Sequence, residues 1–179
     1  GTIGFNYDFN ENHSVGGSYN IDVASSAKGH CDGSQLITGD DVAESSIQQT
    51  IHMQDALGPT HEANLYDVGK VGKMGIDFNG TYLWKKGGRD MQEAEEATGM
   101  ESREVHTSST THNRLLAGKL VLSYPIGKGQ IEFGSEVTAT RSRGVYDNDE
   151  GYVASSSTNV KENNVAGFLT MSYPLGNLS

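Results

Sequence analysis

The feature that most constrains this chain is the strict alternation of apolar and polar residues in short runs. In residues 2–9, Ile3, Phe5 and Tyr7 take alternate positions, and small or polar residues stand between them. Because successive side chains of a β-strand point to opposite faces, this period of two predicts strands that are apolar on one face only. The pattern recurs, and the seven candidate strands cover residues 2–9, 14–23, 60–68, 74–85, 115–124, 130–145 and 164–173.

Composition agrees with an all-β fold and excludes other classes. Glycine supplies 23 of the 179 residues, and each glycine weakens a helix interior by roughly 1 kcal/mol. The net charge of −10, with only 13 Lys and Arg, argues against a nucleic-acid partner, because phosphate contacts need basic patches. No run approaches the ~18 apolar residues of a membrane helix. The single cysteine, Cys31, rules out an internal disulfide.

The connections between the candidate strands alternate between short and long. Residues 10–13, 69–73 and 125–129 make short turns, whereas residues 24–59, 86–114 and 146–163 are long and polar. Soluble domains rarely carry several such loops, but outer-membrane barrels pair short periplasmic turns with long extracellular loops. The predicted fold is therefore an all-β, antiparallel up-and-down meander of about seven strands, an open fragment of a larger outer-membrane β-barrel. A soluble secreted β-sandwich that binds glycan or protein through its loops is the alternative.

The ends of the apolar runs support a lipid-facing surface. Tyr124 and Tyr173 precede short turns, and Trp84 lies near a long connection, as expected for aromatic girdles at membrane interfaces. Along residues 130–145 the apolar face turns cationic at Arg141 and Arg143. At ~3.4 Å per residue and a ~45° tilt, this change lies about 24 Å above the turn, close to the ~25 Å apolar band of a barrel.

The sequences of two polar segments do not decide between helix and strand. Residues 41–57 combine a capping-box pattern, Asp41 with Glu44, with Ile47 and Ile51 at helical spacing, and Gly58 and Pro59 follow as a stop. Residues 90–97 are also helix-prone. Residues 41–57 are either a loop helix or an extension of the flanking strands, and a helix over 90–97 is left equally open.

The chain offers no convergent set of catalytic residues, so no catalytic, cofactor-binding or metal site is predicted and the chain is not expected to be an enzyme. The six histidines are scattered. His30-Cys31-Asp32 alternates between strand faces, and the acidic run from Asp147 to Glu150 lacks the full calcium-loop pattern.

Repeated turn sequences give the chain an internal period. Residues 117–127 read AGKLVLSYPIG and residues 166–176 read AGFLTMSYPLG. Together with NLYDVGK at 64–70, MGIDFNGTY at 74–82, QIEFGSE at 130–136 and KENNVAGF at 161–168, these motifs are similar in order and spacing to one family. The chain resembles the β-barrel part of TonB-dependent outer-membrane receptors, most closely the Bacteroidetes-type outer membrane protein beta-barrel family.

This resemblance implies a location and a set of partners. The parent protein is expected in the outer membrane of a Gram-negative bacterium, where it imports a nutrient and receives energy from the TonB system through a plug domain. Residues 1–179 are expected to be a partial outer-membrane β-barrel domain without the plug domain. The lipid bilayer and an unknown nutrient ligand are the expected partners of the parent, no nucleic acid is expected, and the isolated fragment is expected to self-associate in water.

Overall fold

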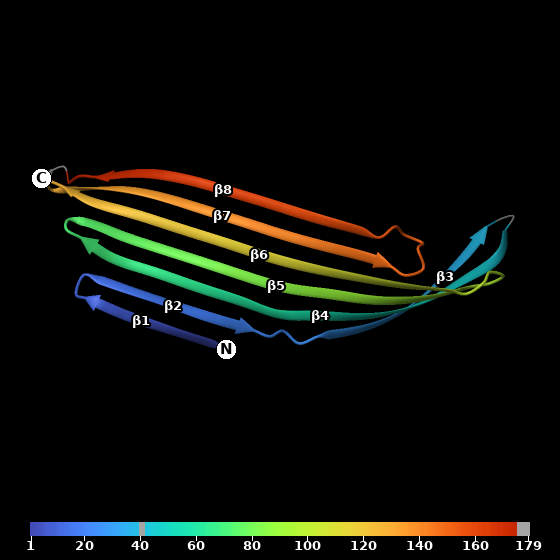
Figure 1. The fold of residues 1–179 in the computed structure, drawn as a ribbon. Coiled ribbons are helices and arrows are strands. Elements are labelled where there is room, and N and C mark those ends of the chain that lie inside the picture. The colour runs from blue at the N-terminus through green and yellow to red at the C-terminus, as the bar shows by residue number, and fades with distance from the viewer. Residues whose placement is uncertain (40–41, 175–179) are drawn as a thin grey trace, which may run out of the picture.

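The chain forms one long, twisted antiparallel sheet in a computed structural model that describes residues 1–39 and 42–174 (Figure 1). The strands follow one another across the sheet in the order β1-β2-β4-β5-β6-β7-β8, and β3 pairs with β4. No described residue pairs β1 with β8, so the sheet is open at both edges. The prediction of an all-β meander that does not close is confirmed. The bounds are β1 Thr2–Asn10, β2 His13–Asp22, β3 Ala27–Gly39, β4 Val42–Val71, β5 Met74–Ala97, β6 Arg103–Ile126, β7 Gly129–Asn148 and β8 Ser156–Ser172.

β2 and β3 act as one interrupted strand along β4. Asp22 pairs with Thr60, and Ala27 pairs with Asp55, so four residues are skipped on each side and the register is unchanged. On the other side of β4, the pairing with β5 slips by one residue between Leu57 and Thr60. Pro59 lies in this stretch and has no N–H to donate, which explains the local loss of the ladder. The eight strands therefore correspond to the seven-stranded meander that the sequence predicts.

The three predicted short connections are confirmed as two-residue turns at one end of the sheet. They lie between Asn10 and His13, between Val71 and Met74, and between Ile126 and Gly129, and all three are at the left of Figure 1. Gly72 and Gly127 have φ angles of 62° and 60°. A side chain is strained in this left-handed region, so the second and third turns require glycine at these two positions.

The prediction of three long loops is wrong, because most of their residues extend the strands instead. β4 runs for 30 residues and β5 for 24, and only residues 98–102 remain between β5 and β6. Residues 90–97 belong to β5, and residues 42–57 belong to β4; residue 41 lies outside the described residues. Extended hairpins satisfy backbone hydrogen bonds without needing an apolar face. The two ends of the sheet still differ, because β4 to β7 extend well beyond β1 and β2 at the end opposite the short turns.

The sheet is a single layer. Contacts between described elements occur only between neighbouring strands, and no hydrophobic side chain among the described residues is buried. A sandwich needs a second sheet packed on the first, and residues 1–39 and 42–174 do not build one. Within the same residues, no helix is long and apolar enough to cross a membrane.

Candidate functional site

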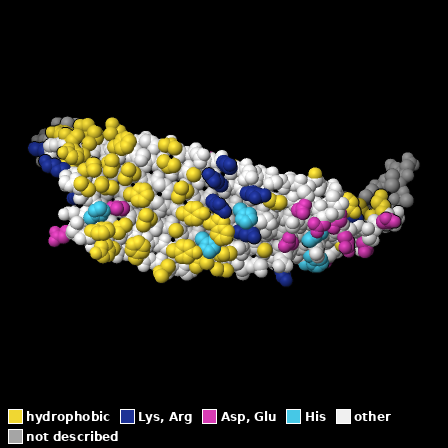
Figure 2. Space-filling view, viewed as in Figure 1, with side chains coloured by type: hydrophobic (Ala, Val, Ile, Leu, Met, Phe, Trp, Pro, Cys, Tyr) yellow, Lys and Arg dark blue, Asp and Glu magenta, His cyan; other side chains and the backbone are white. Residues whose placement is uncertain are grey.

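The strand register places the apolar residues of all strands on a common surface, here called the apolar face. Phe78 pairs with Leu120, and Leu122 pairs with Phe133, so alternation within each strand becomes a continuous patch across the sheet. Figure 2 shows this patch over the end that carries the short turns. Its large members include Ile3, Phe5, Tyr7, Tyr19, Leu65, Phe78, Tyr82, Leu116, Leu120, Leu122, Phe133, Val137, Val165, Leu169 and Met171.

These apolar side chains are exposed to an unusual degree. Val165 exposes 78% of its surface, Leu169 69% and Phe5 61%. Soluble monomers rarely expose contiguous apolar patches beyond a few hundred Å². No described part of this chain folds over the patch, since only neighbouring strands touch. The apolar face therefore needs another medium or another molecule to cover it.

The opposite surface, the polar face, is tied together by side-chain hydrogen bonds. The Tyr66 hydroxyl donates to Asn6 Oδ1 at 2.8 Å, and Thr81 donates to Asn64 Oδ1 at 2.8 Å. The ring of Phe168 lies across the opposing Gly134, where a Cβ would clash with it. Hydrogen bonds between polar groups and rings laid over glycines make this face ordered and hydrophilic, as expected for a water-filled lumen.

A row of aromatic and cationic residues ends the apolar patch. His61, Trp84, Arg114, Arg141 and Lys161 are successive partners across β4 to β8. The rings of His61 and Trp84 lie 4.8 Å apart between centroids, and Tyr19 hydrogen-bonds to His61. Such rings suit an interface where an apolar body meets lipid and a polar tip meets water.

The next row of the same face is also cationic. It pairs Lys86 with His112 and His112 with Arg143. Figure 2 shows the Lys and Arg side chains gathered between the apolar patch and a more distant acidic region. We call Lys86, Arg114, Arg141, Arg143 and Lys161 the cationic belt. Arg141 and Arg143 were recognised from sequence, but the other three were not, because only the register of four strands brings them together.

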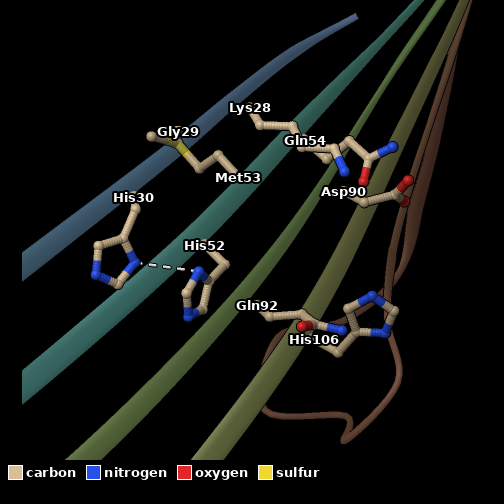
Figure 3. A pocket seen from close by; sticks show the side chains of 9 residues that line it. All are labelled: Lys28, Gly29, His30, His52, Met53, Gln54, Asp90, Gln92 and His106. Carbon is tan, nitrogen blue, oxygen red and sulfur yellow. Dashed lines mark hydrogen bonds between the residues drawn. The ribbon is translucent and has the colours of Figure 1, made fainter.

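Beyond the belt, the same face carries a shallow hollow of about 340 Å³ lined by histidines (Figure 3). His30 Nδ1 lies 3.1 Å from His52 Nδ1, and His106 lines the same hollow. A 2.7 Å hydrogen bond from His106 Nδ1 to the Asp149 carboxylate, helped by the nearby Glu150 and Asp90, raises the pKa of His106.

The sequence segments considered for metal binding make other contacts. Glu150 Oε2 accepts the backbone N–H of His106 at 2.7 Å, and Ser155 donates to Asp147. Cys31 is an exposed free thiol. Among residues 1–39 and 42–174, no three His, Cys, Asp or Glu side chains are grouped to hold a metal ion.

An ion pair between β4 and β5 lies on the outer part of the polar face. Arg89 donates to both carboxylate oxygens of Asp55, from Nε at 2.6 Å and from Nη2 at 3.1 Å. These hydrogen bonds lower the pKa of Asp55 and raise that of Arg89. The pair joins β4 to β5 above the bulge at Pro59, where the ladder between these strands resumes in its shifted register.

No family model matches the chain, and no curated protein matches it. Solved structures that are similar include the ferric yersiniabactin uptake receptor FyuA from Yersinia pestis, at 13% identity and a TM-score of 0.49 over 98% of this chain and 25% of that one. The ferric citrate transporter FecA is 13% identical, with a TM-score of 0.39 over the same two shares. The ferric preacinetobactin receptor BauA from Acinetobacter baumannii is 14% identical, with a TM-score of 0.40 over 93% of this chain and 27% of that one. The chain spans about a quarter of the length of these three proteins.

Proposed function

We propose that residues 1–179 form a partial β-barrel domain in the wall of an outer-membrane receptor. The observation that carries this proposal is the uncovered apolar face, bounded at one end by short turns and at the other by Trp84 and the cationic belt. From Tyr124 to Arg114 on β6 the face runs ten residues, which at ~3.4 Å per residue and a ~45° tilt is about 24 Å of height. The apolar band of an outer-membrane barrel is ~25 Å tall.

The orientation follows from the two ends of the sheet. Two-residue turns belong on the periplasmic side of such barrels, and the long hairpins of β3 to β8 belong outside the cell. The polar face then lines the lumen. The two open edges, β1 and β8, pair with further strands of the same barrel, because an unpaired edge cannot remain in lipid.

The receptor is of the TonB-dependent kind, and it imports a nutrient through a plugged lumen. The sequence motifs that resemble this family support the assignment, together with strands that continue far beyond the apolar band. The partners of the intact protein are the lipid bilayer, the nutrient and the TonB system reached through a plug domain. The chain is a wall and transport element and not an enzyme. In water the isolated fragment self-associates through its apolar face.

Cysteine labelling of the full-length protein in intact cells tests this topology. In a Cys31→Ser background, Met100→Cys places a thiol at the tip of the β5–β6 hairpin, where Met100 is 77% exposed. Lys128→Cys places the matched control thiol in a two-residue turn. A membrane-impermeant maleimide should label position 100 in intact cells and position 128 only after permeabilisation. Equal labelling at both positions, or a soluble periplasmic protein, would refute the proposal.

A further inference from the structure

The cationic belt is unusual because its charges face one another without a counter-charge. Arg114 lies directly opposite Arg141, and Arg141 lies directly opposite Lys161. Like charges opposite each other on a sheet are destabilising. Among the described residues, no carboxylate forms an ion pair with any member of the belt. This is notable in a chain with 23 Asp and Glu and only 13 Lys and Arg.

Two arginines elsewhere in the sheet differ from the belt, because each of them forms an ion pair with a carboxylate on a neighbouring strand. Arg89 pairs with Asp55, and Arg103 pairs with Glu95 at 2.5 Å. In the belt, the row towards the hairpin tips carries Gly88, Thr110 and Val145, none of which is acidic. Among the residues that the structure describes, the belt therefore has no acidic partner, and it presents its donors outward.

The belt also has a shape that suits a compact anion. Arg114, Arg141, Arg143, Lys161 and Asn159 line a hollow of about 470 Å³. One arginine guanidinium donates two parallel hydrogen bonds to two oxygens of a phosphate, so arginine is the favoured residue for binding phosphate. Leu116 and Ala139 form the next row of the apolar face after Arg114 and Arg141, so a ligand held here by its phosphate could lay alkyl chains against Leu116 and Val137.

We propose that the belt binds the phosphorylated headgroup of a glycolipid in the outer leaflet, with the acyl chains on the apolar face. This inference rests on the proposed function, because it needs the apolar face to lie in the outer membrane. The position of the belt fits, since clusters of Lys and Arg beside an apolar span attract anionic lipid headgroups. The row of Trp84 and His61 continues the same boundary towards β4, where aromatic rings replace cations.

The test uses the full-length protein purified from outer membranes in dodecyl maltoside. Three probes are titrated by native mass spectrometry: bisphosphorylated lipid A, lipid A without its phosphates, and inorganic phosphate. The variant Arg114→Gln/Arg141→Gln/Arg143→Gln removes three charges from the belt. The matched control Lys70→Gln/Lys85→Gln/Lys119→Gln removes three charges from the polar face of β4, β5 and β6.

Bisphosphorylated lipid A should bind the wild type and the control alike and the belt variant about a hundredfold more weakly. Lipid A without phosphates should bind the wild type as weakly as the belt variant binds the bisphosphorylated form. Binding by the belt variant within twofold of wild type would overturn the proposal, and so would equal binding of the two lipid A forms by the wild type. Displacement of lipid A by inorganic phosphate at equal concentration would assign the site to free phosphate.

The comparison of the two lipid A forms on the wild type remains informative even if the belt variant fails to assemble. The single variant Arg143→Gln is milder and should weaken the binding of bisphosphorylated lipid A about fivefold. Outer-membrane fractionation of the wild type separates the two hypotheses. A wild type absent from the outer membrane overturns both the proposed function and this inference. An inserted wild type that shows no preference for phosphate overturns the lipid site alone.

Discussion

Leu120→Arg tests whether the apolar face contacts hydrocarbon. Leu120 lies four residues from Tyr124 and six from Arg114 along β6, so at ~3.4 Å per residue and a ~45° tilt it sits about 10 Å above the first and about 14 Å below the second. An arginine on the lipid face near the midplane costs ~2–4 kcal/mol, and the cost falls to ~0–1 kcal/mol near the interfaces. We therefore expect Leu120→Arg to lower the free energy of unfolding by about 3 kcal/mol.

Two companion variants test separately how the cost of an arginine depends on its depth in the membrane and on the face of the sheet that carries it. Leu116→Arg lies two residues from Arg114, about 5 Å below the belt, and should cost about 1 kcal/mol. Val121→Arg is adjacent to Leu120 but belongs to the polar face, with Lys119 beside it on that face, and should cost less than about 1 kcal/mol. The assay is urea titration of the full-length protein in phosphatidylcholine vesicles, followed by heat-modifiability on gels. Equal costs at positions 120 and 121, or a larger cost at 116 than at 120, would refute a lipid-facing surface.

Three further outcomes follow from the contacts described above. Gly129→Ala should destabilise the protein by about 1–3 kcal/mol, because a Cβ there would lie 2.5 Å from the backbone oxygen of Ser172. Gly144→Ala on the same strand meets nothing within 4 Å and should be neutral. Equal costs for the two variants in urea titration would contradict this. The pKa of His106 is raised above its ordinary value of 6.5 by Asp149, so the pair stabilises the β7–β8 connection fully below about pH 6.5 and is lost as the pH rises through the raised value. Hydrogen exchange of that connection, corrected for intrinsic rates, should be slower at pH 5.5 than at pH 8, and Asp149→Asn should remove the difference. Finally, light scattering of the isolated chain in detergent-free buffer should show oligomers, and a clean monomer would contradict the exposed apolar face.

The sequence predicted the fold where one face of a strand is apolar and the other is polar. The alternation in residues 74–85 and 115–124 corresponds to the parts of β5 and β6 that carry the apolar patch. The prediction stopped at residues 86–97 and 103–114, which continue the same two strands. Both faces of these extensions are polar and face water, so burial imposes no period on their sequence, and helix-forming residues such as Glu93 and Ala94 do not prevent the ladder from continuing.

The cationic belt shows a different limit. Arg141 and Arg143 could be read from one strand, because they follow an apolar run at the same period. Arg114 and Lys161 are 27 and 20 residues from Arg141 in sequence, and nothing local indicates that they meet it. Their meeting depends on the pairing of β6, β7 and β8, which the turns at Gly127 and at the β7–β8 connection set.

The shared register of β2 and β3 along β4 limits how the length of this chain can change through evolution. An insertion of one residue into the paired part of β3 between Cys31 and Ser34, unmatched opposite in β4, would rotate the β3 side chains before it to the other surface, whereas an insertion into the unpaired residues 23–26 would leave every β3 pair in place. The tip of the β5–β6 hairpin carries no such constraint. Homologous chains should therefore vary in length at the hairpin tips and at the unpaired residues between β2 and β3, and stay constant along the paired runs of β3 and β4.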